Sequence, residues 1–329
     1  MFLINICIKK VQRIPRLLLV LLVIVLLLIL YFGYNKEETI ATDYKYYYHP
    51  PWNNFSFPEI NETQVLENEG KNVGIAPPQY LSTSKKRKDS NNNTHLLIFQ
   101  FVLSSEDRQA LLYVFQTFVR ACLKFNVTFF LYSGTLIGSL RHHDMIPWDD
   151  DIDVMVNTSH KETLRKALSS VGNNFHFHIV NTFWKFFWTK GHPVRHLPYT
   201  WPFIDIFFFA ENSTHIFDEE PMFQKEFTYN KQLVFPLCLR PFAGSLLPVP
   251  RNTTAVVNQT YSLSHCAPLS YSHKLEKVLP KNPKAIIPCT ELYKLYPFVF
   301  YQQIRGRVHE MLLFNTTLLG TFEVPEHCG

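Results

Sequence analysis

The sequence contains no Cys-x-x-Cys pair, although six cysteines are present. This pair is the strongest short signal of a zinc ribbon or of a redox-active dithiol, so neither class of site is indicated. Cys266 directly follows His265, and His273 lies nearby, which is a weak metal-binding signal. A structural role is the favoured interpretation of Cys266.

Charge is absent from the segment Leu17–Phe32, LLLVLLVIVLLLILYF. As a helix rising about 1.5 Å per residue it would be roughly 24 Å long, which suits a thin membrane of the early secretory pathway. Basic residues precede the segment, and Glu37 and Glu38 follow it, so the positive-inside rule places the amino terminus in the cytosol. No A-x-A-like cleavage site follows, which favours a signal-anchor over a cleaved signal peptide.

We therefore expect a single-pass type II protein of the Golgi or ER membrane, held in the lipid bilayer by one transmembrane helix. The predicted parts are a cytosolic tail (1–16), a signal-anchor (17–33), a lumenal stem (34–94) and a lumenal folded domain (95–329). The stem contains the basic run KKRK at Lys85–Lys88. In a lumenal linker such a run is interpreted as a solvated segment, so no nucleic-acid partner is expected.

Asparagine sequons and cysteines support a lumenal body. Nine Asn-x-Ser/Thr sequons lie beyond the apolar segment, whereas chance would give about 2 or 3. The predicted N-glycosylation sites are Asn54, Asn61, Asn92, Asn126, Asn157, Asn212, Asn252, Asn258 and Asn315. The cysteines beyond the segment are Cys122, Cys238, Cys266, Cys289 and Cys328. Five is an odd number, so one thiol is left free, buried or paired with another chain.

Apolar periodicity beyond His95 predicts alternating helices and strands. Ser104-Ser-Glu-Asp107 fits a helix start, and apolar residues three and four apart continue this helix to about Lys124. A second helix is expected over 159–171, and strands over 127–133, 152–156, 175–180, 183–189 and 203–209. After Glu211 the chain is rich in loops, and the next expected element covers 304–313. The fold class is therefore α/β or α+β, with a mixed sheet and flanking helices.

Four aspartates gather in the stretch HDMIPWDDDIDVMV, at Asp149, Asp150, Asp151 and Asp153. The chain as a whole has a net charge of +5, so this cluster is not part of a general acidic surface. Like charges at such close range repel and raise one another's pKa unless they share a cation. The stretch therefore predicts a local cation site.

Side chains alternate along a strand, so Asp151 and Asp153 are expected on one face about 7 Å apart. Asp149 is expected to reach the same point from the preceding turn. Such carboxylates bind a hard cation, Mg²⁺ or Mn²⁺, which keeps waters and shares ligands with substrate phosphates. Asp150 is expected to point the other way, as a turn or cap residue only.

The same aspartates fit two alternatives to this metal site. A calcium-binding EF-hand loop is disfavoured, because Val154 and His160 occupy the positions that need Gly and Glu. A solvated acidic turn without a ligand stays open as the second alternative. The apolar residues on both sides of the cluster weigh against it.

A Gly-Thr turn precedes the aspartates. Ser133-Gly134-Thr135 ends the first predicted strand and opens a short helix, whose backbone amides and dipole can hold a phosphate. The hydroxyl of Thr135 or Ser139 would add a hydrogen-bond donor. Three basic residues that follow would neutralise phosphate charge, although a solvated helix end explains them about as well. They are Arg141, His142 and His143.

Asp205 is a lone carboxylate within the apolar run FIDIFFF. A buried unpaired charge is costly, so Asp205 needs a partner. The cation bound by the other aspartates would be one. Asp205 could also take a proton from an acceptor hydroxyl.

The stretch LYSGTLIGSLRHHDMIPWDDDIDVMV, followed by FIDIF, resembles the LicD, fukutin and fukutin-related protein family. The resemblance implies a nucleotidyltransferase-like fold and metal-dependent transfer of a phospho-alcohol, phosphocholine or ribitol phosphate, from a CDP-linked donor to a glycan acceptor. The match to the family is strongest from about Phe129 to Val156, weaker at Asp205 and weakest at Phe242–Asn252. Where many family members carry a Tyr-Gly pair, this chain has Tyr261-Ser262.

The resemblance and the residue patterns together give the predicted site. Donor binding is predicted for Gly134, Thr135, Ser139, Arg141 and His142, metal binding for Asp149, Asp151, Asp153 and Asp205, and catalysis for Asp151, Asp153 and Asp205. Two other functions stay open. One is a metal-dependent glycosyltransferase of the D-x-D type, against which the Gly-Thr turn argues. The other is a non-catalytic binding or helper protein with the same fold.

Overall fold

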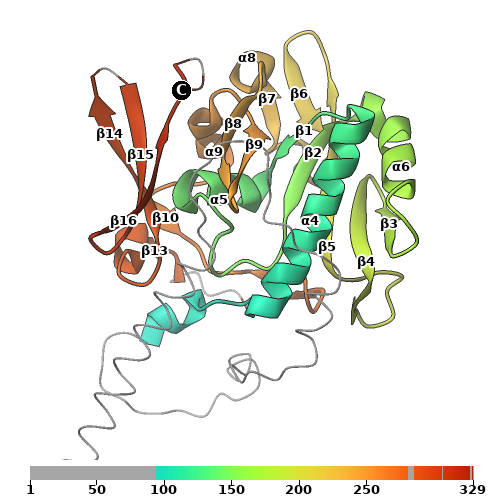
Figure 1. Cartoon of the computed structure of the whole chain (residues 1–329), viewed down its shortest axis with the longest axis horizontal. Helices are drawn as coiled ribbons and strands as arrows, with labels where there is room; N and C mark the ends of the chain where they lie inside the picture. Colours follow the sequence, from blue (N-terminus) through green and yellow to red (C-terminus); the bar gives the residue numbers. More distant parts are fainter. Residues whose placement is uncertain (1–93, 281–284, 306, 327, 329) are drawn as a thin grey trace, which may run out of the picture. The chain divides into compact units, whose positions relative to one another are not determined.

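The computed structural model describes residues 94–329, except 281–284, 306, 327 and 329, and Figure 1 shows the arrangement of its elements. The predicted signal-anchor and nearly all of the predicted stem lie outside the described residues. Within the described part of the chain, no helix is both long enough and apolar enough to cross a membrane. The described residues form a mixed α/β fold.

The helices and strands have the following bounds. The α-helices are α4 (Ser105–Phe125), α5 (Ser133–His142), α6 (Lys161–Ser169), α7 (Pro221–Gln224), α8 (Lys231–Val234) and α9 (Thr253–Thr260), and the 3-10 helices are η2 (Thr94–Phe99), η3 (Thr158–His160) and η5 (Cys289–Leu292). The longer strands are β1 (Phe129–Leu131), β2 (Asp153–Asn157), β3 (Phe175–Val180), β4 (Phe183–Pro193), β5 (Thr200–Glu211), β14 (Phe298–Ile304), β15 (Arg307–Phe314) and β16 (Thr317–Glu323). The others are β6 (His215–Asp218), β7 (Thr228–Asn230), β8 (Cys238–Phe242), β9 (Ser245–Val249), β10 (His265–Cys266), β11 (Tyr271–Ser272), β12 (Lys277–Val278) and β13 (Ile287–Pro288).

The main sheet has seven strands in the order β1-β2-β5-β4-β3, and β6 and β7 extend it from β5. β2 and β5 are parallel, whereas the other neighbours in this sheet are antiparallel. The sheet is therefore mixed, as the sequence predicts. The register of the parallel pair sets Asp153 directly beside Asp205.

Helix α4 lies across the main sheet and covers it (Figure 1). Its start is fixed by a capping box, in which the Ser104 and Asp107 side chains each accept a hydrogen bond from the other residue's amide. Its inner face buries Phe115 and Phe118 completely. The ring centroids of Phe118 and Phe129 of β1 are 5.2 Å apart, so the helix and the sheet share one aromatic core.

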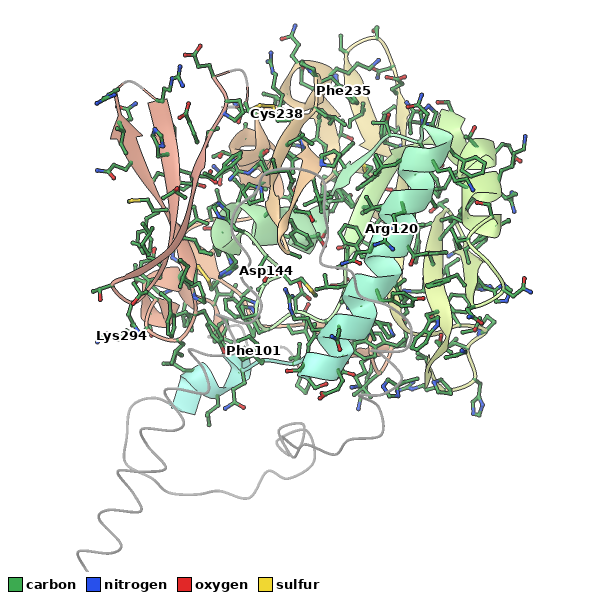
Figure 2. All side chains as sticks on the ribbon, viewed as in Figure 1. Phe101, Arg120, Asp144, Phe235, Cys238 and Lys294 are labelled. Carbon is green, nitrogen blue, oxygen red and sulfur yellow. A yellow bond between two sulfur atoms is a disulfide. The ribbon has the colours of Figure 1, made fainter. Side chains whose placement is uncertain are left out.

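Helix α5 lies between the main sheet and the three-stranded sheet β14-β15-β16 (Figure 1). Its end packs against the loop that follows. A Cβ on Gly138 would come within 2.4 Å of the backbone oxygen of Asp144, so only glycine fits there. Arg108 of α4 holds the same loop through two hydrogen bonds to Asp144, of 2.8 and 2.9 Å (Asp144 is labelled in Figure 2).

A buried ionic network attaches the C-terminal sheet to the rest of the fold. Glu310 of β15 is fully buried, accepts a 2.5 Å hydrogen bond from Arg240 of β8, and lies 2.8 Å from Nε2 of His143. Burial alone would raise the pKa of Glu310, but His143 and Arg240 lower it. The carboxylate is therefore ionised and paired.

Two disulfides join segments of the second half of the domain. They are Cys238–Cys328 and Cys266–Cys289, and Cys122 is a free, buried cysteine in α4. Of the three options for the odd cysteine, the buried free thiol is the one found. Because Cys266 is in a disulfide, it is not available as a thiolate ligand, and its structural role is confirmed.

The elements expected before Glu211 are present, with small shifts at their ends. The strand predicted over 175–180 coincides with β3, and the strand predicted over 203–209 is extended to Thr200–Glu211. β1 is shorter than the predicted 127–133. Beyond Glu211 the structure has many short elements that no sequence period indicates. The expected element at 304–313 consists of the end of β14 and most of β15.

Candidate active site

Three carboxylates converge where β2 begins. Asp153 is the first residue of β2, Asp151 lies just before it, and Asp205 is its neighbour in β5. One oxygen of each lies within 4.8 Å of the other two, and all three residues are buried. Carboxylate oxygens at this spacing are suitable ligands for a hard divalent cation such as Mg²⁺ or Mn²⁺. These residues therefore fit a metal site.

The metal-free cluster is electrostatically unfavourable. Burial, and then the neighbouring carboxylates, raise the pKa of Asp151 and Asp153 to about 8 each. Each acid therefore retains its proton at neutral pH in the absence of a cation. A divalent cation would favour the ionised forms of both.

Asp149 lies beside this trio and is not one of its members. Its Oδ2 lies so close to the start of α5 that a Cβ on Gly134 would be 2.9 Å away, so glycine allows this approach. Burial first, and then Asp151 and Asp150, raise the pKa of Asp149 well above its ordinary value. Of the four aspartates predicted to bind the metal, the converging trio thus contains Asp151, Asp153 and Asp205 but not Asp149. A metal-binding role for Asp149 stays a prediction.

The Gly-Thr turn is joined directly to the acidic strand. The Thr135 side-chain oxygen accepts a 2.8 Å hydrogen bond from the backbone amide of Asp153, which fixes the start of α5 against the start of β2. Within the described part of the chain, no side chain caps the N-terminus of α5. Its first amides are therefore of the kind that can bind an anionic ligand.

Tyr261 adds a hydroxyl to the same region. Its OH lies 2.8 Å from the Ser133 hydroxyl. Burial raises the pKa of Tyr261 to about 12, and Asp153, Asp149 and Asp151 contribute to the increase. The phenol is therefore protonated at neutral pH and can act as a hydrogen-bond donor.

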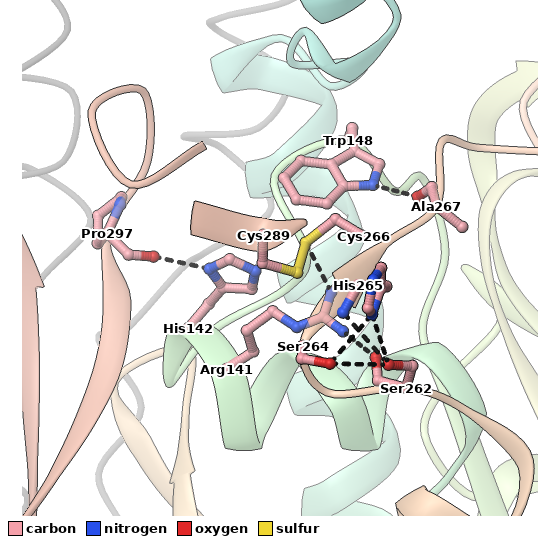
Figure 3. Close-up of a disulfide and its surroundings, with 10 residues drawn as sticks. All are labelled: Arg141, His142, Trp148, Ser262, Ser264, His265, Cys266, Ala267, Cys289 and Pro297. Carbon is pink, nitrogen blue, oxygen red and sulfur yellow. Dashed lines mark hydrogen bonds between the residues drawn. A yellow bond between two sulfur atoms is a disulfide. The ribbon is translucent and has the colours of Figure 1, made fainter. Parts of the chain in front are cut away.

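The other residues predicted to bind the donor make structural contacts. Ser139 is fully buried and donates a 2.9 Å hydrogen bond to the backbone oxygen of Pro241. Arg141 donates to the backbone oxygen of Ser262 at 3.0 Å and contacts the sulfur of Cys266 at 3.4 Å (Figure 3). The structure therefore places both side chains against the second half of the domain.

His142 is also enclosed. Its Nδ1 lies 2.7 Å from the backbone oxygen of Pro297 (Figure 3). Burial lowers the pKa of His142 to about 3, so the ring is neutral and Nδ1–H is the donor. The donor-binding role of Ser139, Arg141 and His142 stays a prediction, while Gly134 and Thr135 lie next to the aspartates.

Asp150 does more than end a turn, which corrects the expectation for this residue. Its carboxylate accepts hydrogen bonds from the amides of His273 and Lys274, the Ser272 hydroxyl and the Nδ1 of His273, over 2.9 to 3.2 Å. Burial would raise the pKa of Asp150, but these donors lower it. Asp150 therefore holds the β11–β12 hairpin against the active site.

His273 joins that hairpin to the acidic cluster. Its Nε2 lies 3.1 Å from Oδ2 of Asp151, and Asp150, Asp151 and His273 are a second group with metal-binding geometry. Burial would lower the pKa of His273, but Asp151 and Asp150 raise it well above its ordinary value. The ring is therefore an imidazolium, and its ionised partner in this structure is Asp150, 2.9 Å from Nδ1.

Lys185 of β4 is the direct counter-ion of Asp205. The two residues are opposite one another in the β4–β5 register, and Lys185 Nζ donates to both carboxylate oxygens of Asp205, at 2.8 and 3.0 Å. The ammonium also lies 3.6 Å from the ring centroid of Phe203, a favourable cation–π contact. Asp205 therefore has the partner that a buried carboxylate needs.

Sequence reasoning missed Lys185 as a site residue and gave His273 only as part of a weak metal-binding signal. It also did not single out Glu276, whose Oε1 lies 3.3 Å from Nζ of Lys185. Lys185 carries a signal that could have been used, because it is a lone charge in the aromatic run FWKFFW, just as Asp205 is in FIDIF. His273 and Glu276 lie in the loop-rich part of the chain. Only the folded position of the β11–β12 hairpin brings them to the aspartates.

Residues 126–252 match the family described as LicD/FKTN/FKRP, nucleotidyltransferase domain. The chain contains a LicD-family nucleotidyltransferase domain. The matched segment includes Gly134, Thr135 and all five aspartates of the site, from Asp149 to Asp205. His273 and Glu276 lie beyond it.

A stretch of 52 residues is also 40% identical to the lipopolysaccharide cholinephosphotransferase LicD of Haemophilus influenzae. It covers 16% of this chain and 20% of the bacterial protein. The chain thus spans about a fifth of the length of this curated relative. The activity in that name belongs to the bacterial protein.

Proposed function

We propose that this LicD-family domain transfers a phospho-alcohol from a CDP-linked donor to a hydroxyl group of a glycan acceptor. The alcohol phosphate would be of the phosphocholine or ribitol phosphate type. The observation that carries the proposal is the convergence of Asp151, Asp153 and Asp205 next to the Gly134-Thr135 turn. This arrangement has ligands for a divalent cation and amides for a phosphate in one place.

The site residues of this chain would have the following roles. Asp151, Asp153 and Asp205 would hold Mg²⁺ or Mn²⁺, which when bound neutralises phosphate charge in a phosphoryl transfer. The first amides of α5 would receive a donor phosphate oxygen. The hydroxyl of Tyr261, protonated at neutral pH, would be a neutral hydrogen-bond donor at the same place.

The test measures group transfer from a panel of candidate donors. The full-length protein, purified with bound detergent, is incubated with Mn²⁺, a glycan acceptor, and CDP-alcohols or nucleotide-sugars in separate reactions. The expected result is CMP release together with a gain in acceptor mass equal to one phospho-alcohol. Sugar transfer from a nucleotide-sugar would support the D-x-D glycosyltransferase instead. Failure to bind Mn²⁺ and to turn over any donor would support the non-catalytic helper.

We also propose that the domain lies in the lumen of the Golgi or ER, on a type II anchor. Two disulfides and several sequons support an oxidising, glycosylating compartment. Asn126, Asn258 and Asn315 have exposed side chains, as a glycan requires. Removal of N-glycans from cell-made protein should increase its mobility on a gel, and an unchanged mobility would defeat this location.

A further inference from the structure

We propose that Glu276 is the general base that accepts the proton of the acceptor hydroxyl, and that Lys185 and Tyr271 position its carboxylate. This inference rests on the proposed function. Glu276 lies outside the family-matched segment and in neither of the two groups with metal-binding geometry. Its assignment therefore comes from its contacts in the fold.

The hairpin that carries Glu276 is held firmly at the acidic cluster. Asp150 receives four hydrogen bonds from the hairpin, as described above. Lys274 of the same hairpin donates a 2.7 Å hydrogen bond to Asp107, at the start of α4. These contacts fix the hairpin at the side of the site where Asp151 and Asp205 lie.

The two oxygens of Glu276 have different surroundings. Oε2 accepts a 2.8 Å hydrogen bond from the hydroxyl of Tyr271. Among the described residues, none donates a hydrogen bond of good geometry to Oε1, which is buried and lies 3.3 Å from Nζ of Lys185. The Tyr199 hydroxyl interacts with the same carboxylate. Buried carboxylate oxygens without a donor are uncommon, because the lost hydration is not replaced. Oε1 is therefore the oxygen with unused capacity to accept a proton once a substrate hydroxyl reaches it.

Lys185 connects this oxygen to the metal-binding trio. Its ammonium donates to both oxygens of Asp205 and also lies within ion-pair distance of Glu276. One nitrogen atom thus stands between the two carboxylates. A base in this position would be next to the metal site without being one of its ligands.

The other carboxylates of the site are less suitable as bases. Asp151, Asp153 and Asp205 point their oxygens at a common cation position, and cation binding opposes protonation. Both oxygens of Asp205 already accept hydrogen bonds from Lys185. The carboxylate of Asp150 is saturated by hairpin donors. Glu276 is better suited than these four aspartates to accept the proton, which changes the hypothesis that Asp205 acts as the base.

The step is balanced in atoms and electrons. The acceptor oxygen forms a bond to the phosphorus that carries the alcohol, and the bond from this phosphorus to the bridging oxygen breaks. CMP leaves with the electron pair of that bond. The proton of the acceptor hydroxyl moves to Oε1 of Glu276 and later to solvent, so that the products are a phosphodiester and CMP.

The experiment compares Glu276→Gln with the parent, using the donor that the parent transfers best. Gln is close in shape and retains an oxygen that can accept the Tyr271 hydrogen bond. The expected result is a fall in kcat of roughly 10² to 10⁴, the usual contribution of a positioned base. Glu276→Asp should recover part of the activity.

Two further measurements separate catalysis from structure. Mn²⁺ affinity by calorimetry should change less than about twofold in Glu276→Gln, a difference of about 0.4 kcal/mol. The Tm should stay close to that of the parent. In Asp205→Asn, by contrast, the loss of activity should come with a loss of Mn²⁺ affinity. Lys277→Gln, on the exposed part of the same hairpin, is the matched control and should behave as the parent.

The possible outcomes distinguish this inference from the proposed function. An active parent with a fully active Glu276→Gln would overturn only the base assignment. An inactive variant that has lost Mn²⁺ affinity or a large part of its Tm would also overturn it, since Glu276 would then be a ligand or a structural residue. A parent that transfers no phospho-alcohol would overturn both.

Discussion

At the scale of single residues, the aspartates of this site differ in role because they differ in partners. Asp150 is bound by donors of the hairpin, and Asp205 is paired with Lys185. Asp151 and Asp153 have a pKa of about 8, because burial and like charge oppose their ionisation. Environment can thus separate the roles of chemically identical groups. Asp151 and Asp153 are the two that gain most from a cation.

Replacing Asp153 with Asn should therefore weaken metal binding without weakening the metal-free fold. The variant removes one of three converging ligands and also one member of a repulsive cluster. Mn²⁺ affinity measured by calorimetry should fall at least about tenfold, or 1.4 kcal/mol. The Tm without metal should be equal to that of the parent or higher.

The matched control is Glu211→Gln, which removes an exposed carboxylate at the end of β5, the strand that carries Asp205. Its Mn²⁺ affinity should equal that of the parent. Unchanged affinity in Asp153→Asn would exclude this residue from the metal site. A large drop in its metal-free Tm would show that the carboxylate stabilises the fold itself.

At the scale of elements, the position of α5 depends on the close contact between Gly138 and the backbone of the loop that follows the helix. Alanine has the higher helix propensity, by about 1 kcal/mol. A Cβ here would, however, meet the backbone oxygen of Asp144 at 2.4 Å, and overpacking against backbone typically costs about 1 to 3 kcal/mol. Gly138→Ala should therefore lower the Tm measured by scanning calorimetry, despite the gain in propensity.

Gly134 of the same helix is the comparison. Its Cβ would meet the side-chain oxygen of Asp149 at 2.9 Å, and a side chain can move more easily than backbone. Gly134→Ala should lower the Tm less than Gly138→Ala does. If Gly138→Ala is as stable as the parent, the packing of α5 against the following loop has been described wrongly.

The elements also show which parts of the fold and the site can be predicted from the sequence. The capped helix α4 and the strands before Glu211 were predictable, because each has its own cap or hydrophobic pattern. The convergence of Asp151 and Asp153 followed from strand alternation. The pairing of Lys185 with Asp205 did not, since it depends on which strands are neighbours and in what register.

The hairpin is the clearest part of the site that sequence alone could not place. β11 and β12 have two residues each, too few for a pattern of alternation. Contacts with distant parts of the chain hold this hairpin, such as the hydrogen bonds of Asp150 and Asp107. No local propensity encodes such contacts. Glu276 could therefore be recognised as a site residue only in the folded chain, and only there could the weak signal of His273 be assigned to Asp150 and Asp151.

At the scale of the whole molecule, the acidic cluster links stability to pH and to metal. Asp151 and Asp153 have a pKa of about 8 in the folded protein, far above the ordinary aspartate value of 3.8. For an acid whose folded pKa is raised, the stability contribution is fully present below the unfolded pKa. It is lost as pH rises through the folded pKa. The metal-free protein should thus lose stability from this source between about pH 4 and pH 8.

A divalent cation should reverse this trend, because it binds the ionised carboxylates and must displace their protons. Mn²⁺ affinity should rise with pH and level off above about pH 8, with a gain of roughly tenfold or more between pH 6 and pH 7. The increase in Tm on adding Mn²⁺ should likewise be larger at pH 8 than at pH 6. Calorimetry in two buffers of different ionisation enthalpy counts the protons released, and Asp153→Asn should release fewer. An affinity that is constant from pH 6 to pH 8, with no proton release, would mean that Asp151 and Asp153 are not the residues that bind the cation.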